Sequence, residues 1–191
     1  MTQPLTLIGL MGPAGAGKDT AADHLEDQHG FVRYAFADPM RTMLEAAFTS
    51  VGIDYAYIYE RSLKEQPVPG IGYSYRQLAQ TLGTEWGRNQ LDPDLWLRFA
   101  ALNLGLPDAP VNDRIVITDV RFANEAAWIV QHGGVVLRIR RDVAPVRPHV
   151  SETAMQTIEP WGDIANTQGI DWLHLQIDSA LELLQRKQAQ A

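Results

Sequence analysis

A glycine-rich stretch near the start of the sequence has the spacing of a phosphate-binding loop. Residues 12–20 read GPAGAGKDT, so Gly12, Gly17 and Lys18 fit the pattern G-x-x-x-x-G-K. Glycines let successive backbone N–H groups turn toward a phosphate, the following helix N-terminus adds partial positive charge, and the lysine supplies a mobile cation. We therefore predict that phosphate groups are bound by Gly12, Ala14, Gly15, Ala16, Gly17, Lys18, Asp19 and Thr20.

Three oxygen-bearing side chains could hold the metal ion that phosphate chemistry requires. Asp19 stands where this pattern usually has the Ser or Thr that binds Mg²⁺, and Thr20 follows it. Asp119 ends the apolar run 115–119, which has the character of a buried parallel strand. We predict that Asp19, Thr20 and Asp119 hold Mg²⁺, directly or through water. Helix capping by Asp119 and a dipole partner at Asp19 are the structural alternatives.

Arginines downstream could stabilise charge on a transferred phosphoryl group. Arg121 comes two residues after Asp119 and could face that group, although a solvated or structurally paired arginine would have the same spacing. The densest basic stretch of the chain contains Arg138, Arg140, Arg141, Arg147 and His149. As the exit of a strand into a loop, this stretch suits a lid that brings cations over a polyphosphate. A solvated charge run and a small nucleic-acid patch are the alternatives.

Apolar periodicity and Gly or Pro breaks predict the elements that would position these residues. Short apolar runs predict strands over residues 5–10, 31–36, 115–119, 135–139 and 172–177. Helices are predicted over 18–29, ending at Gly30, over 124–132, and from about positions 38, 74, 93 and 179. Residues 51–73 contain several Pro and Gly residues and predict a long irregular segment, of the kind that forms lids or binding loops.

Strands separated by helices predict an α/β fold, a three-layer, doubly wound sheet of about five parallel strands. Sites in such sheets lie at the carboxyl ends of the strands, which would bring together the glycine-rich loop, Asp38, Asp119 to Arg121, and Arg140 onward. At 191 residues the chain suits a single P-loop domain. Its helical and irregular insert would cover about 51–113, and its arginine-bearing lid about 140–165.

Composition narrows the class of protein. The net charge of −7 argues against sequence-independent nucleic-acid binding. The absence of cysteine excludes disulfides and thiolate chemistry, and fits a reducing compartment. The sequence has neither a basic and apolar leader nor an apolar run near eighteen residues. We therefore expect a cytoplasmic protein with no membrane or nucleic-acid partner.

Taken in order, these pieces resemble the bacteriophage deoxynucleoside monophosphate kinase family. The family's usual loop reads GKD-T rather than GK-[ST], so Asp19 fits the resemblance. The matching segments are residues 12–20, 36–39 (FADP), 75–78 (YRQL), 82–85 (LGTE), 87–88 (GR), 119–125 (DVRFANE), 133–134 (GG), and His149 with Ser151 and Glu152.

The resemblance implies a kinase that uses ATP and Mg²⁺, with ATP on the loop and a deoxynucleoside monophosphate opposite. Lys18 and Arg121 would stabilise the transferred phosphoryl, and Arg140 would act from the lid. Glu125 and Asn166 would support the nucleotide sites. The predicted acceptor-binding residues are Asp38, Lys64, Arg76, Gln80, Glu85, Arg88, Asp119, Asn124 and Glu152.

Two other readings of the sequence remain open. A kinase for another small acceptor, such as dephospho-coenzyme A or a sugar acid, would share the fold and the loop. A nucleotide-binding switch would use the loop without transferring phosphate to a metabolite, but the sequence has no N-K-x-D motif, and Asp119 is followed by Val-Arg-Phe. The sequence does not indicate which base is accepted, and it leaves a homodimer open.

Overall fold

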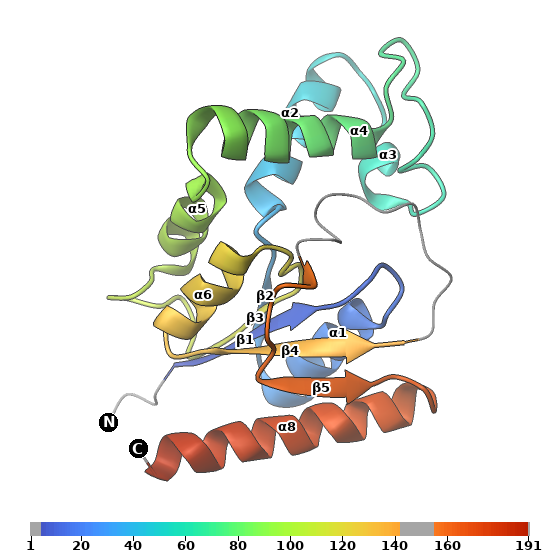
Figure 1. Ribbon diagram of the computed structural model, residues 1–191. Coiled ribbons are helices and arrows are strands. Elements are labelled where there is room, and N and C mark those ends of the chain that lie inside the picture. The colour runs from blue at the N-terminus through green and yellow to red at the C-terminus, as the bar shows by residue number, and fades with distance from the viewer. Residues whose placement is uncertain (1–4, 142–154, 191) are drawn as a thin grey trace. The chain divides into compact units, whose positions relative to one another are not determined.

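The computed structural model describes residues 5–141 and 155–190, in which the chain forms two compact units (Figure 1). The first contains the described residues of Met1–Ala35 and Ala101–Ala191, and the second is Phe36–Ala100. The glycine-rich loop belongs to the first unit. The segments around Asp38, Tyr75 and Arg88 belong to the second.

A parallel five-stranded sheet forms the centre of the first unit. Its strands are β1 (Thr6–Met11), β2 (Val32–Tyr34), β3 (Arg114–Ile117), β4 (Val135–Arg140) and β5 (Gly162–Ala165), in the spatial order β2-β3-β1-β4-β5. The connection after β1 runs to β2 on one side, and the connection after β3 runs to β4 on the other. The carboxyl ends of β1 and β3 therefore form the switch point where such folds place their sites. This architecture confirms the predicted P-loop α/β fold class.

Helices cover both faces of this sheet. On one face, α1 (Lys18–His29) and α8 (Ile170–Gln190) share a core with the strands, to which Leu10, Leu25 and Leu137 belong. On the other face, α6 (Ala123–Gln131) packs so closely on β1 that a Cβ at Gly9 would lie 2.5 Å from Cδ1 of Ile129. The three layers predicted from the alternation of strands and helices are therefore present (Figure 1).

The second unit is helical. It contains α2 (Asp38–Ser50), α3 (Ala56–Tyr59), α4 (Tyr75–Gln80) and the π-helix η1 (Thr81–Leu91), and α5 (Leu95–Leu104) begins in it. Its small core consists of Phe48, Ile58, Val68 and Tyr75. Ser74 begins α4 with a capping box, because its hydroxyl accepts from the N–H of Gln77 and its own N–H donates to the Gln77 side chain.

The prediction of a last strand over residues 172–177 is wrong. These residues lie inside α8, and the fifth strand is instead Gly162–Ala165. Alternating apolar residues at 173, 175 and 177 suggested a strand, but Leu173 and Ile177 are buried whereas the side chain of Leu175 is 55% exposed. With Leu181 and Leu184, the buried residues follow helical spacing.

None of the helices in the described ranges is both long enough and apolar enough to cross a membrane.

The two leucines of α8 provide a test of this correction. Leu173→Ala should lower the free energy of unfolding by about 2–4 kcal/mol, because it leaves a cavity in the core. Leu175→Ala should cost less than about 1 kcal/mol, because its side chain faces solvent. Urea unfolding measures both. Equal losses would contradict the helix, since a strand would place both side chains on the same face.

Candidate active site

The glycine-rich loop connects β1 to α1 and takes backbone conformations that favour glycine. Gly12 and Gly17 have φ angles of 145° and 106°. A Cβ at Gly12 would lie 2.4 Å from the carbonyl oxygen of Ile139 in β4, and one at Gly17 would lie 2.5 Å from Nδ2 of Asn166. A side chain at either position would therefore meet backbone or a buried amide as well as strained dihedrals.

Lys18 begins α1 and directs its ammonium back over the loop. Its Nζ donates to the carbonyl oxygens of Gly12 at 2.7 Å and Pro13 at 3.0 Å. An anion at the N-terminus of α1 would meet both the helix dipole and this cation. Asp19 and Thr20 follow in the first turn of α1, Asp19 exposed and Thr20 half-buried.

Asn166, which follows β5, connects the glycine-rich loop to the end of β4. Its Nδ2 donates to the carbonyl oxygen of Ala16 at 2.8 Å, and its backbone N–H donates to that of Arg140 at 2.7 Å. The residue is 8% exposed. The resemblance assigned it to a nucleotide site, and the contacts make it a positioning residue for the phosphate-binding loop.

The segment after β3 lies beside the end of β1, because the N–H of Val120 donates to the carbonyl oxygen of Leu10 at 3.2 Å. Asp119 is half-buried there, and the side chain of Arg121 is exposed. The buried carboxylate of Glu125 accepts from the N–H groups of Arg121 at 2.7 Å and Phe122 at 3.0 Å. Glu125 therefore fixes this turn at the start of α6 through the backbone.

The arginines at the end of β4 have different partners. Arg140, the predicted lid arginine, donates to Asp163 in β5 through Nε at 2.7 Å and Nη2 at 3.0 Å. Arg138 donates to the carbonyl oxygen of Ile158 at 2.5 Å. The Nη1 of Arg141 instead lies 3.4 Å from the carbonyl oxygen of Gly15 in the phosphate-binding loop. Sequence reasoning missed Asp163, because only the register of β4 and β5 reveals its position.

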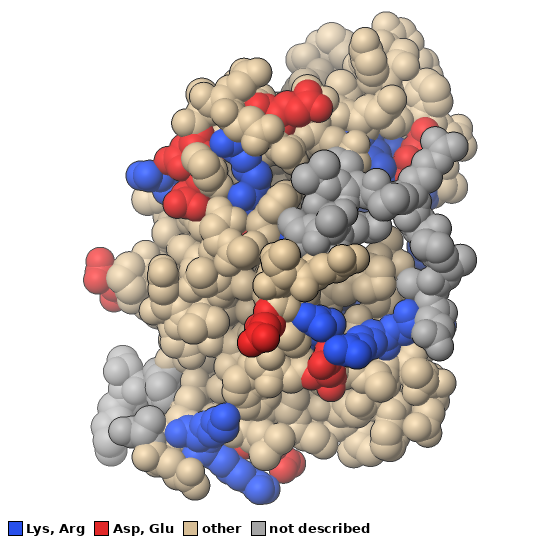
Figure 2. Space-filling model, viewed as in Figure 1, with Lys and Arg blue, Asp and Glu red and all other residues tan. Residues whose placement is uncertain are grey.

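Charges of both signs lie close together on the surface. On the face shown in Figure 2, Lys and Arg side chains occur in small groups beside Asp and Glu. The two bonds between Arg140 and Asp163 are one instance of such pairing. An arginine already paired with a carboxylate is less available to a phosphate, which favours Arg141 over Arg140 as a loop-facing cation.

In the second unit, Asp38 begins α2 and pairs with Arg41 one turn later. Burial raises the pKa of Tyr75, and the nearby guanidinium of Arg41 opposes part of that rise. Sequence reasoning did not single out Arg41, although its i, i+3 spacing from Asp38 was a usable signal.

Lys64 and Arg76 lie near the same tyrosine in this unit. The backbone N–H of Arg76 donates to the carbonyl oxygen of Lys64 at 3.1 Å, and the Lys64 Nζ lies 6.0 Å from the centroid of the Tyr75 ring. The guanidinium of Arg76 pairs with Glu65. Two predicted acceptor residues are therefore neighbours, each with a partner of its own.

The LGTE and GR segments have structural roles in η1. The indole N–H of Trp96 donates to the carbonyl oxygen of Gly83 at 2.8 Å, and a Cβ at Gly87 would lie 2.6 Å from Cζ2 of the same indole. Arg88 is 9% exposed and donates to the carbonyl oxygen of Pro93 at 3.0 Å. Packing against Trp96 therefore accounts for Gly87, whereas a Cβ at Gly83 would lie 2.9 Å from Sδ of Met40. Arg88 stabilises the turn after η1.

The predicted site residues fall into two sets. The first unit holds the phosphate-binding loop, Asp119, Arg121, Asn124 and Arg140 at the carboxyl-terminal edge of its sheet. The second holds Asp38, Lys64, Arg76, Gln80, Glu85 and Arg88, with Gln80 half-buried and Glu85 exposed. Glu152 and His149 lie outside the described residues, as does Arg147. The roles of all these residues in binding and catalysis stay predictions.

Asn166 gives a test of how the loop is held. Asn166→Ala should lower the free energy of unfolding by about 1–3 kcal/mol, because a buried carbonyl loses its donor. It should also weaken several-fold the ATP binding that the sequence predicts for this loop, as Ala16 is no longer fixed. Gln176→Ala is the matched control, since its amide bonds the backbone of Ala165 in a more exposed position. Denaturant unfolding and ATP titration measure both effects, and equal ATP affinity in the two variants would contradict the positioning role.

Comparison with known proteins shows the family to which the chain belongs. The sequence matches the deoxynucleotide monophosphate kinase family over residues 6–75 and 72–177. A mimivirus protein, provisionally named a deoxynucleotide monophosphate kinase, from Acanthamoeba polyphaga mimivirus is 34% identical over 194 residues, which cover 93% of this chain and 97% of that protein. An adenylate kinase from Sphingopyxis alaskensis is 46% identical over 46 residues, only 24% of this chain and 20% of that protein.

Solved structures resemble the chain more distantly. Protein TT1252 from Thermus thermophilus has 17% identity and a TM-score of 0.49, covering 95% of this chain and 99% of that one. The APS kinase CysC of Mycobacterium tuberculosis has 14% identity and a TM-score of 0.47 at the same coverage. Membership rests on the sequence matches, which span most of the chain and include the glycine-rich loop. The chain belongs to the deoxynucleotide monophosphate kinase family.

Proposed function

We propose that this protein transfers the γ-phosphate of ATP to a deoxynucleoside 5′-monophosphate, giving the diphosphate used in DNA precursor synthesis. The observation that carries the proposal is the loop of Gly12 to Lys18, with the ammonium folded over its carbonyls, in a chain that belongs to this family. The bacteriophage origin suggested by the resemblance stays a prediction.

The donor phosphates would bind at the N-terminus of α1, where loop N–H groups and the helix dipole favour negative charge. Lys18 would turn its three N–H donors from the carbonyls of Gly12 and Pro13 to phosphate oxygens. In the reaction, an oxygen of the acceptor phosphate forms a bond to the γ-phosphorus. The bond from that phosphorus to the β,γ-bridging oxygen breaks, and its electron pair leaves with ADP. Lys18 and Arg121 would stabilise the charge on the group in transfer.

Mg²⁺ fits the donor set at this edge of the sheet. Asp19, Thr20 and Asp119 offer carboxylate and hydroxyl oxygens, which are the ligands that Mg²⁺ takes, and all three belong to the first unit. These residues would hold the ion, which would neutralise charge on the polyphosphate. Asp19 is exposed in the first turn of α1, so it can reach a bound ion without displacing core residues.

The acceptor would be held by the second unit. A monophosphate carries about two negative charges near pH 7, so its pocket needs cations. Lys64 supplies one near Tyr75, Arg76 would supply a second on leaving Glu65, and Arg88 would supply a third in η1. The buried position of Arg88 means that its replacement should affect folding as well as acceptor KM.

A kinase for another small acceptor is the alternative, because the phosphate-binding loop would be the same. ADP formation from ATP and Mg²⁺ should be measured with each deoxy- and ribonucleoside monophosphate, and with dephospho-coenzyme A and a sugar acid. The proposal expects at least one deoxynucleoside monophosphate to be preferred over every non-nucleotide acceptor. A preference for dephospho-coenzyme A or the sugar acid would overturn it.

Lys18 gives a direct test of the catalytic loop. Lys18→Met should lower kcat by roughly 100-fold or more, because a preorganised cation is lost. The free energy of unfolding should fall by only about 1–2 kcal/mol, because the substitution removes just two hydrogen bonds to loop carbonyls. Lys187→Met is the matched control, because Lys187 lies in α8 with its Nζ over the ring of Trp161. Steady-state kinetics should show normal activity for the control, and a fully active Lys18→Met would contradict the assignment.

The two arginines after β4 can be separated by kinetics. Arg141→Met should lower kcat/KM by roughly 10-fold, because its guanidinium approaches Gly15 in the loop. Arg140→Met should have a smaller effect, since Arg140 is held by Asp163 at the surface. A larger loss in Arg140→Met would restore Arg140 as the lid arginine.

A further inference from the structure

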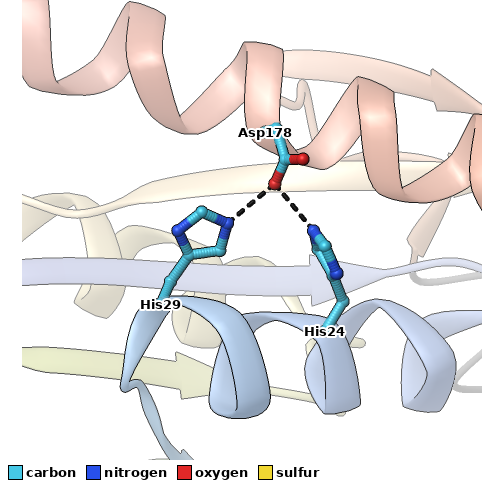
Figure 3. A group of neighbouring side chains, drawn as sticks. All are labelled: His24, His29 and Asp178. Atoms are coloured by element: carbon cyan, nitrogen blue, oxygen red, sulfur yellow. Dashed lines mark hydrogen bonds and ion pairs between the residues drawn. The ribbon is translucent and has the colours of Figure 1, made fainter.

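A cluster of two histidines and an aspartate joins α1 to α8, and the proposed kinase function does not use it. His24 and His29 lie in α1, and Asp178 lies in α8 (Figure 3). The Nε2 atoms of both histidines lie 2.7 Å from the same oxygen, Oδ1 of Asp178. The three potential ligand atoms all lie within 4.8 Å of one another.

The side chains converge as the ligands of a metal ion would. Figure 3 shows both imidazole rings turning a nitrogen toward Asp178 from the same side of α8. Ligands at about 2.0–2.1 Å around a tetrahedral ion lie roughly 3.3 Å apart, so small side-chain rotations would admit a cation among these atoms. The ion would take the place of two N–H protons that now converge on a single carboxylate oxygen.

The surroundings favour a cation. The carboxylate of Asp178 gives the cluster an anionic ligand beside the two imidazoles. The side chains of His24, His29 and Asp178 are 9%, 25% and 39% exposed, so the cluster is anchored on one side and open to solvent on the other.

A fourth side chain orients the cluster. The ring of His174, one turn before Asp178, stacks on that of His24 with centroids 4.0 Å apart and an interplanar angle of 12°. Stacking restricts rotation of the His24 ring, in the manner of groups that orient metal ligands from outside the coordination sphere. Three protein ligands with one position left to water is a common zinc arrangement.

We propose that His24, His29 and Asp178 form a binding site for a divalent transition-metal ion of the Zn²⁺ class, which fastens α8 to α1. Two imidazoles and a carboxylate suit Zn²⁺, Co²⁺ or Ni²⁺, whereas Mg²⁺ takes oxygen ligands. This site differs in ligand chemistry from the oxygen set proposed for catalysis.

The test uses the full chain without a histidine tag, stripped by chelator, and without nucleotide. Co²⁺ should bind at one ion per chain and give the visible absorption of a four- or five-coordinate site. Zn²⁺ should displace it, and Mg²⁺ at millimolar concentration should not. Zn²⁺ should also raise the midpoint of thermal unfolding by several degrees, because it binds the folded state. Absence of both binding and stabilisation by Zn²⁺ and Co²⁺ would overturn the proposal.

Variants locate the site. His29→Gln and Asp178→Asn should each weaken Zn²⁺ binding at least 10-fold, with circular dichroism confirming that they fold. His132→Gln is the matched control, because it removes a histidine that packs on Trp128 at the end of α6. His174→Gln should retain binding within a few-fold. A loss in His132→Gln equal to that in His29→Gln, or undiminished binding in His29→Gln and Asp178→Asn, would place the metal elsewhere and overturn the proposal. Because no nucleotide is present, failure here would leave the kinase proposal untouched.

Discussion

The close approach of the phosphate-binding loop to the neighbouring strands is the constraint on which the site depends. Gly12 lies against the carbonyl of Ile139, and Gly17 against the amide of Asn166, with no room for a Cβ at either position. These contacts fix the loop to β4 and to the residue after β5, so the start of α1 and the Lys18 ammonium have defined positions. Close contacts between the loop and the neighbouring strands therefore position the site as much as any charged side chain does.

The first unit concentrates the groups that would bind ATP, and the second carries its own cluster of cations around Tyr75. This division suits phosphoryl transfer, in which the protein contributes mainly position and electrostatic stabilisation. Hydrogen-bond partners separate two kinds of residue that spacing alone does not distinguish. Arg141 reaches toward the loop, whereas Arg140, Glu125 and Arg88 have partners that explain them structurally.

Local signals predicted much of the first unit. The spacing of Gly12, Gly17 and Lys18 identified the loop, and helix α1 runs from Lys18 to His29 as predicted, with Gly30 following in a left-handed conformation. Non-local features were not predictable in this way. The strand Gly162–Ala165 is too short and polar to stand out, while the alternating apolar residues of 172–177 imitate a strand within α8. The pairing of Arg140 with Asp163 depends on strand register, which the sequence does not display.

The most direct test of the central claim is to identify the product. Phosphorus NMR should follow ATP and the preferred deoxynucleoside monophosphate, with Mg²⁺ and the full chain present. The account predicts that the γ-phosphate signal of ATP is lost as ADP and a deoxynucleoside diphosphate form in equal amounts. Release of inorganic phosphate with the monophosphate unchanged would show a nucleotide hydrolase, and would contradict the assignment as a kinase of deoxynucleoside monophosphates.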